Sequence, residues 1–185
     1  MRGGLSFARL MGAIALTVTV SFTAFAPGGC KKREAAKTEA VKKEGPASGI
    51  GEPAIPFKVK TFDGGEFDLE GMKGSVVVVN FFASWCGPCK VEAPGLQSAY
   101  SAFKDSGVVF IGVAIDDTEK GAKEFIKNYG ITFPAAIDDT GEIARAYKLF
   151  GVPDTFIIGR DGRFIFSHMG DISEEELVKE IKKAL

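Results

Sequence analysis

Two cysteines separated by two residues carry the main chemical potential of this sequence. Cys86 and Cys89 stand in the stretch "NFFASWCGPCKVEAP", in a chain that has three cysteines in all. A pair at this spacing can bind a metal, form a structural staple or work as a redox couple. The rest of the sequence has to distinguish these three uses.

A metal site and a structural staple both fit the pair poorly. Structural zinc needs four ligands, and only Cys30 and His168 remain as further candidates, neither at ligand spacing. We therefore expect no metal. A disulfide that closes so small a loop would contribute little stability, because the entropic effect grows with loop length.

The predicted elements around the pair favour a redox couple. Residues 75–83, "SVVVVNFFA", form a β-branched and aromatic run typical of a buried strand. A helix is predicted over 88–104, with a kink at Pro94. Cys86 would then stand at a helix N-terminus, where free N–H groups and the helix dipole lower a thiol pKa. Cys89, one turn later, could resolve a mixed disulfide, and no cofactor beyond the Cys86–Cys89 disulfide is expected.

The remaining elements predict the fold class. A second buried strand is expected over 107–115, and helices over 118–130 and 139–151. Residues 154–170 indicate two strands joined at "RDGR", and "SEEELVKEIKKAL" is a closing helix that opens with a capping box. A hairpin over 57–74 precedes them all. We expect an α/β protein with a central mixed sheet flanked by helices and an extra N-terminal β-hairpin.

The first 52 residues are predicted to lie outside this domain. An uncharged run over 10–26 that follows basic residues has the layout of an export signal. Cys30, after "PGG", loosely resembles the lipidated cysteine of bacterial lipoproteins, although Pro27 departs from that motif. Segment 1–30 is thus a signal or lipoprotein segment or an uncleaved membrane anchor, with Cys30 then a free thiol. Either reading tethers the domain outside the cytoplasmic membrane.

Charge is distributed unevenly along the chain. Residues 31–52 begin with a Lys/Ala/Glu stretch and end in Gly and Pro, which predicts a charged flexible tether. The folded domain is expected over 53–185. From residue 45 onward 15 basic residues face 21 acidic ones, and such an acidic domain does not suit nucleic acid, which needs clustered Lys and Arg.

Several motifs together resemble the thioredoxin superfamily. They are "WCGPC" within "NFFASWCGPCKVEAPGL", "FPAAIDDTGEIARAYKLFGVPDTFIIGRDGR" and the "HMGDI" tail. The resemblance is narrower to its membrane-tethered TlpA/ResA group, which includes the CcmG (DsbE) reductants of cytochrome c maturation. It covers about residues 53–185 and implies a thioredoxin-like fold.

The resemblance implies roles for the cysteines and their neighbours. Cys86 matches the exposed nucleophile and Cys89 the resolving thiol. Glu92 matches the family's acidic active-site residue and could accept a proton from Cys89; the alternative is an ordinary exposed helix glutamate. Asn80 stands where thioredoxins proper keep a buried aspartate.

The resemblance also implies a substrate-binding surface. Val152 and Pro153 match the cis-proline loop that faces the cysteines and offers backbone to an extended substrate. Trp85 is predicted to contact substrate beside Cys86, with packing as the alternative. Gly87 and Pro88 form the dipeptide of thioredoxin type, and thioredoxin is a reductant at about −270 mV, against about −120 mV for the oxidant DsbA.

By the same resemblance we expect a reductant of protein disulfides. Its implied substrate is a protein with a C-x-x-C disulfide such as apocytochrome c, and its implied electron donor is a membrane protein of the DsbD/CcdA kind. A reductant for copper-site assembly in a terminal oxidase, an oxidant or isomerase, and a peptide-binding module that uses the cis-proline face stay open. A thiol peroxidase is disfavoured because Ala83 stands where a peroxidatic cysteine needs a threonine. We expect a monomer.

Overall fold

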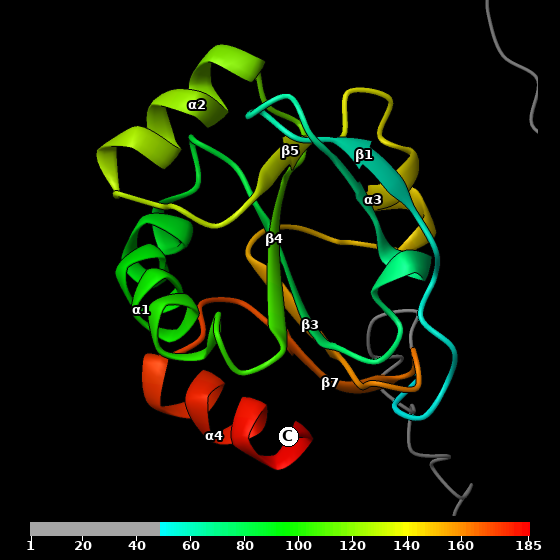
Figure 1. Ribbon diagram of the computed structural model, residues 1–185. Helices are drawn as coiled ribbons and strands as arrows, with labels where there is room; N and C mark the ends of the chain where they lie inside the picture. The colour runs from blue at the N-terminus through cyan, green and yellow to red at the C-terminus, as the bar shows by residue number, and fades with distance from the viewer. Residues whose placement is uncertain (1–48) are drawn as a thin grey trace, which may run out of the picture. The chain divides into compact units, whose positions relative to one another are not determined.

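A five-stranded mixed sheet forms the centre of the domain. The structure is a computed structural model that describes residues 49–185 (Figure 1). The sheet order is β5-β4-β3-β6-β7. The strands are β3 (Val76–Phe82), β4 (Val108–Ala114), β5 (Ala135–Ile137), β6 (Asp154–Ile158) and β7 (Phe164–Met169).

Strand β3 is the central element. It pairs with β4 in parallel and with β6 antiparallel, so both of its edges are hydrogen-bonded. All seven of its residues are buried, which explains why its sequence is continuously β-branched and aromatic rather than alternating. The strands predicted over 75–83 and 107–115 are confirmed to within one residue at each end.

Two layers of secondary structure cover the sheet. On one face lie α1 (Gly87–Phe103), α2 (Glu119–Asn128) and α4 (Glu174–Ala184), whose apolar residues share one core with Val76, Val78 and Phe82 (Figure 1). On the other face, α3 (Glu142–Ala146) and the N-terminal segment share a second core with Val77, Val79 and Phe81. The alternation of side chains along β3 therefore separates the two cores.

The predicted N-terminal hairpin is present as β1 (Lys58–Lys60) and β2 (Glu66–Asp68), followed by the 3₁₀ turn η1 (Leu69–Met72). Gly64 has φ +90° in its turn, a conformation that glycine adopts without steric cost. The N–H of Phe62 donates to the carbonyl of Ala135 at 2.8 Å. The hairpin thus covers the edge strand β5, which would otherwise offer free backbone groups.

Two features of the middle segment were predicted wrongly. Strand β5 was not predicted, because a run of three residues after Pro134 carries too little pattern to indicate a strand. The helix expected over 139–151 is confined to α3, Glu142–Ala146. Lys148 has φ +48° and interrupts the helical path, so the chain continues as a loop towards Pro153.

The chain joins the sheet just before the predicted domain boundary. The N–H of Gly51 donates to the carbonyl of Phe164 at 2.7 Å, and the N–H of Phe164 donates to the carbonyl of Glu52 at 2.9 Å. The predicted signal or anchor segment, Cys30 and the tether up to residue 48 lie outside the described residues. Within 49–185, no helix has both the length and the apolar content needed to cross a membrane.

Tyr147 locks the N-terminal segment onto the sheet. It is fully buried, and its hydroxyl donates to the carbonyl of Ile55 at 2.8 Å. Burial raises the pKa of its phenol, so it is a neutral donor at all ordinary pH. Its ring lies 5.1–5.8 Å, centroid to centroid, from four phenylalanine rings: Phe57, Phe81, Phe156 and Phe164.

Removal of the Tyr147 hydroxyl should destabilise the domain measurably. Tyr147→Phe keeps the ring packing but removes the donor to the partly buried Ile55 carbonyl, which should lower the free energy of unfolding by about 1 kcal/mol. Urea unfolding with an unchanged m-value is the measurement. Tyr129→Phe is the matched control, because Tyr129 is partly exposed, and a shift within about 0.5 kcal/mol is expected there. Equal stability of the two variants would show that the Tyr147 hydroxyl contributes nothing.

Candidate active site

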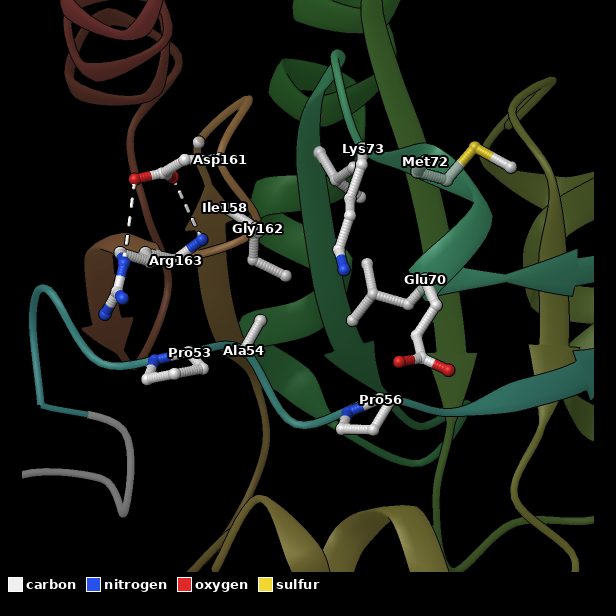
Figure 2. A pocket seen from close by; sticks show the side chains of 13 residues that line it. Pro53, Ala54, Pro56, Glu70, Met72, Lys73, Ile158, Asp161, Gly162 and Arg163 are labelled. Atoms are coloured by element: carbon white, nitrogen blue, oxygen red, sulfur yellow. Dashed lines mark hydrogen bonds and ion pairs between the residues drawn. The ribbon is translucent and has the colours of Figure 1, made fainter.

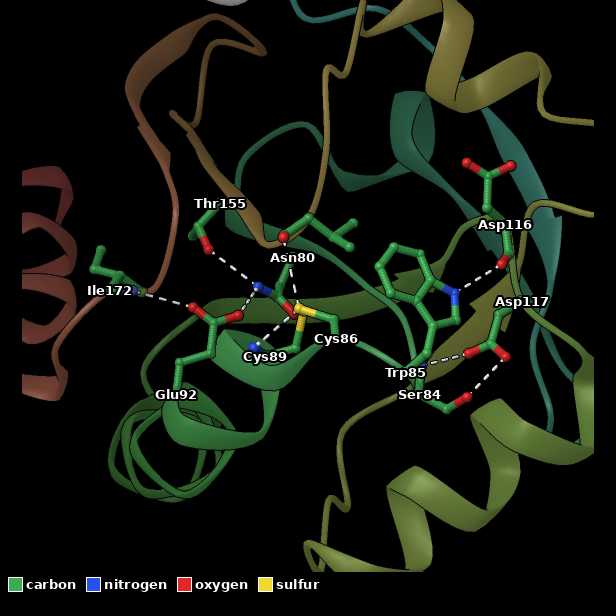
Figure 3. The surroundings of a disulfide bond; sticks show 11 residues. Asn80, Ser84, Trp85, Cys86, Cys89, Glu92, Asp116, Asp117, Thr155 and Ile172 are labelled. Atoms are coloured by element: carbon green, nitrogen blue, oxygen red, sulfur yellow. Dashed lines mark hydrogen bonds between the residues drawn. A yellow bond between two sulfur atoms is a disulfide. The ribbon is translucent and has the colours of Figure 1, made fainter.

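The two cysteines lie where β3 ends and α1 begins, as predicted. They form a disulfide with an S–S distance of 2.07 Å (Figure 3). Cys86 is the N-cap of α1, and its Sγ accepts the Cys89 N–H at 3.1 Å. After reduction the same N–H and the positive end of the helix dipole are available to a Cys86 thiolate. Pro88 stands in the first turn, where its missing N–H costs no helical hydrogen bond.

The expectation of an exposed Cys86 is wrong for the disulfide form. The exposed fraction is 3% for Cys86 and 1% for Cys89. The carbonyl oxygen of Val152 lies 3.5 Å from Cys86 Sγ, and the Val152–Pro153 peptide bond is cis. This loop is 66 residues away in sequence, which is why no local pattern around Cys86 indicates the cover.

The neighbours of the cysteines are more accessible than the sulfur atoms. Gly87 and Pro88 are exposed, and 61% of Trp85 is accessible. Phe150, three residues before Pro153, is 85% exposed. Exposed aromatic side chains therefore stand close in sequence to Cys86 and to the Val152–Pro153 loop, and we call Trp85 and Phe150 the apolar rim. Sequence analysis missed Phe150, and an aromatic residue next to a Gly-x-Pro turn could have indicated it.

Glu92 lies inside the protein and takes part in a buried polar network (Figure 3). Its exposed fraction is 3%, so the alternative of an exposed helix glutamate is wrong. Asn80 Nδ2 donates to Glu92 Oε1 at 2.8 Å and to Thr155 Oγ1 at 3.1 Å. The Ile172 N–H donates to Glu92 Oε2 at 3.1 Å. Asn80 and Thr155 are register partners on β3 and β6, so their side chains share the face that α1 covers.

Burial controls the protonation of this network. It raises the pKa of Glu92 to about 7, against the lowering effect of the hydrogen bonds from Ile172 and Asn80 and with a further increase from Asp171 and Asp154. Burial also raises the pKa of Asp154 to about 6, opposed by His168. Asp154 Oδ1 is buried and has no hydrogen-bond partner among residues 49–185. Glu92 can therefore gain or lose a proton near neutral pH, which suits a general base.

The segment before Cys86 is held by residues that follow β4. Trp85 Nε1 donates to the carbonyl of Asp116 at 2.9 Å, and both Oγ and N–H of Ser84 donate to the carboxylate of Asp117 (Figure 3). Sequence analysis missed both aspartates. Their place directly after a parallel strand could have indicated them, because the carboxyl ends of adjacent parallel strands lie along one edge of the sheet.

A hollow of about 400 Å³ lies at the other end of the sheet (Figure 2). It is lined by Val77 and Ile158, which are register partners near the start of β3, and by the turn around Arg163. None of the predicted site residues lines it. This hollow is therefore separate from the redox pair.

Fold and site together define the class of protein. A thioredoxin-like sheet that places a Cys-x-x-Cys disulfide at a helix N-terminus, opposite a cis-proline loop, is the arrangement of a thiol–disulfide oxidoreductase. The chain belongs to the AhpC/TSA family, which matches residues 50–166, and is an oxidoreductase of the TlpA/ResA/CcmG-like kind.

Similar proteins support this assignment. The chain is 37% identical over 134 residues to the thiol-disulfide oxidoreductase ResA of Bacillus thuringiensis subsp. konkukian, a match that covers 72% of this chain and 78% of that protein. A thiol:disulfide interchange protein of the thioredoxin family from Chlorobium tepidum TLS has a TM-score of 0.66 and 30% identity, over 71% of this chain and 94% of that one. StoA of Bacillus subtilis has a TM-score of 0.62 and 29% identity, over 70% and 98%.

The raised pKa of Glu92 predicts how stability depends on pH. The folded protein holds the Glu92 proton up to about pH 7, whereas an unfolded glutamate releases it near 4.5. The free energy of unfolding should therefore fall as pH rises through this window, by about 3 kcal/mol from Glu92. Glu92→Gln should remove most of this slope in urea unfolding of the disulfide form between pH 5 and 8.

Glu175→Gln is the matched control, because Glu175 is an exposed residue of α4 and its variant should keep the wild-type slope. Asp154 contributes to the lower part of the window, so a small slope below about pH 6 is expected to remain in Glu92→Gln. The same slope in Glu92→Gln as in the wild type would show that Glu92 is already ionised in the folded protein.

Proposed function

We propose that this oxidoreductase reduces protein disulfides outside the cytoplasmic membrane, with cytochrome c maturation as its pathway. The direction rests on one observation, the near-complete burial of both cysteines beside the buried Glu92. Burial disfavours a thiolate. DsbA is a strong oxidant because its reduced form is stabilised. A site that gives the thiolate only weak stabilisation leaves the disulfide as the favoured form, and such a protein acts as a reductant.

The hydrogen bonds at the sulfur atoms fit this direction. Cys86 Sγ accepts one N–H at the helix N-terminus, a contribution of up to about 2 kcal/mol in a partly buried geometry. Burial acts in the opposite sense, and at Glu92 it outweighs two hydrogen bonds. Lys90, in the first turn of α1, is exposed, so it stabilises a thiolate less than a buried cation would.

The exchange itself follows in two displacements. The Cys86 thiolate attacks one sulfur of the substrate disulfide, and the first substrate thiolate leaves. Cys89 gives its proton to Glu92 and attacks Cys86 Sγ, which releases the second substrate thiolate. Two electrons pass to the substrate, and the protein becomes the disulfide. The first substrate thiolate takes a proton from solvent, which balances the proton that Cys86 released to solvent before its attack, and the second substrate thiolate takes the proton held by Glu92. Glu92 suits the proton step because it is one helical turn from Cys89, which is 1% exposed.

The apolar rim supports a polypeptide substrate. Trp85, directly before Cys86, and Phe150, three residues before Pro153, are exposed aromatic residues. Val152 and Pro153 would offer backbone to an extended chain, as the resemblance implies. Gly87 and Pro88 are accessible at the start of α1, so their backbone is available to a substrate directly beside Cys86.

The location and the partners rest on the sequence and the relatives. Segment 1–30 has the layout of an export signal or anchor, with Cys30 as the proposed lipidation site. Apocytochrome c fits as substrate because its C-x-x-C-H thiols must be free for haem attachment. A DsbD/CcdA-type membrane protein fits as the electron donor, because a reductant in an oxidising compartment must be reduced again. Copper-site assembly in a terminal oxidase is the second pathway compatible with this chemistry.

The reduction potential of the pair tests the direction. Equilibration of the purified protein against thiol buffers should give a value near that of thioredoxin, about −270 mV, and far below the about −120 mV of DsbA. Cys86→Ser and Cys89→Ser should each fail to close the disulfide and serve as blanks. A value near that of DsbA would make the protein an oxidant or isomerase and remove the proposed direction.

Trapping tests the substrate. Cys89→Ser should accumulate a mixed disulfide between Cys86 and an oxidised C-x-x-C-H peptide, because the resolving thiol is missing. Cys86→Ser should trap nothing. Preferential trapping of an oxidised dithiol peptide from a copper-site assembly factor would move the assignment to oxidase assembly. A Cys86→Ser protein that restores holocytochrome to a deletion strain would favour the peptide-binding module. Consumption of hydrogen peroxide by the wild-type protein would favour a peroxidase.

A further inference from the structure

One carboxylate, that of Asp117, links two segments that lie 33 residues apart in sequence. The Ser84 N–H donates to Asp117 Oδ2 at 2.5 Å, and the Ser84 hydroxyl donates to Asp117 Oδ1 at 2.8 Å. The Thr118 N–H donates to the same Oδ1 at 2.7 Å. Ser84 lies two residues before Cys86, and Thr118 is the N-cap of α2. Asp117 therefore ties the approach to the redox cysteine to the start of another helix.

The residue before Asp117 holds the residue after Ser84. Asp116 has φ +49°, a left-handed conformation that is uncommon outside glycine and is tolerated best by Asn and Asp. Its carbonyl accepts Trp85 Nε1–H at 2.9 Å. Asp116 therefore holds Trp85, and the next residue, Asp117, holds the residue before Trp85, which is Ser84.

Gly121 leaves the space in which this contact forms. A Cβ atom at this position would lie 2.7 Å from Ser84 Oγ and 2.8 Å from Asp117 Oδ1. Both distances are shorter than van der Waals contact, so any side chain at 121 would displace the Ser84–Asp117 pair. The first turn of α2 is therefore shaped around this hydrogen bond.

We propose that Asp117 is a positioning residue for exchange with protein substrates, and that it acts by holding Trp85 at the approach to Cys86. Trp85 is 61% exposed, so packing alone does not fix it. Its indole donates to the Asp116 carbonyl, and Asp117 holds both the adjacent Ser84 and, through the chain, Asp116. A mobile indole would have to be ordered each time a polypeptide docks, and that ordering weakens binding. The proposal depends on thiol–disulfide exchange alone and not on its direction or pathway.

The kinetic test compares a protein disulfide with a small one. Asp117→Ala should lower kcat/KM for the reduction of insulin about tenfold, mainly by raising KM. The kcat/KM of the same variant with Ellman's reagent should stay near the wild-type value, because a small disulfide does not contact the rim. Asp117→Asn keeps one oxygen for the Ser84 N–H and should recover part of the loss. Equal losses with both disulfides, or no loss with insulin, would overturn the proposal.

Trp85 supplies a direct readout, because it is the single tryptophan of the chain. In the wild type, the change of tryptophan fluorescence on reduction of the disulfide reports on the indole beside Cys86. Asp117→Ala should shrink this change and lower the steady-state anisotropy of Trp85. Unchanged anisotropy would show that other contacts hold the indole.

Matched variants separate positioning from folding. Asp161→Ala removes a carboxylate that accepts the Arg163 N–H at 3.1 Å, in the turn between β6 and β7 at the other end of the sheet. This variant should leave unchanged the ratio of kcat/KM for insulin to kcat/KM for Ellman's reagent.

Ser84→Ala and Gly121→Ala disturb the Ser84–Asp117 contact while they keep Asp117, and each should lower this ratio. If Asp117→Ala does not fold, these two variants carry the test, and normal ratios in both would overturn the proposal. The Ser84→Ala/Asp117→Ala double variant should be no worse than Asp117→Ala alone, since the two side chains act as one unit.

Discussion

The burial of β3 on both faces and both edges is the constraint from which the site follows. A strand in this position admits a polar side chain only where hydrogen bonds satisfy it. Asn80 is the one polar residue of Val76–Phe82, and its amide is satisfied by Glu92 from α1 and Thr155 from β6. Because side chains alternate along a strand, Asn80 faces α1. The buried polar network therefore lies next to Cys89 and not in the opposite core.

Two opposing effects act on the sulfur atoms. The N-terminus of α1 stabilises a thiolate at Cys86, and desolvation destabilises it. At Glu92, burial raises the pKa to about 7 although two hydrogen bonds oppose the increase. Desolvation acts on the buried cysteines in the same region. The proposed direction, reduction of the substrate, requires that desolvation at Cys86 outweighs the stabilisation from the helix N-terminus.

The surroundings of the disulfide differ between its Trp85 side and its Glu92 side. Figure 3 shows Trp85 and Glu92 on opposite sides of Cys86. On the Trp85 side, Asp116 and Asp117 hold the exposed indole and Ser84 through hydrogen bonds. On the Glu92 side, buried groups from α1, β3 and β6 form a polar network. The loop of Val152 and Pro153 lies over the Cys86 sulfur, so the proposed recognition and proton transfer would use separate parts of the fold.

The sequence by itself determined the strand, the helix and the pair at their junction. The run over 75–83 indicates a buried strand by composition alone, and the cysteines follow at a distance that a strand-to-helix turn requires. Glu92 and Pro153 were located by family resemblance, not by any local physical pattern. Strand β5 was missed because three residues carry no periodicity, and it exists because β4 and the N-terminal hairpin pair with it.

Only the tertiary structure decided the environment of those residues. The cover on Cys86 comes from Val152, the partners of Glu92 from β3 and the segment before α4, and the support of Trp85 from the loop after β4. Each contact joins residues more than ten positions apart, and burial, pKa and hydrogen-bond partners depend on such contacts. Sequence patterns report the preferences of neighbours along the chain, whereas these properties arise from neighbours in space.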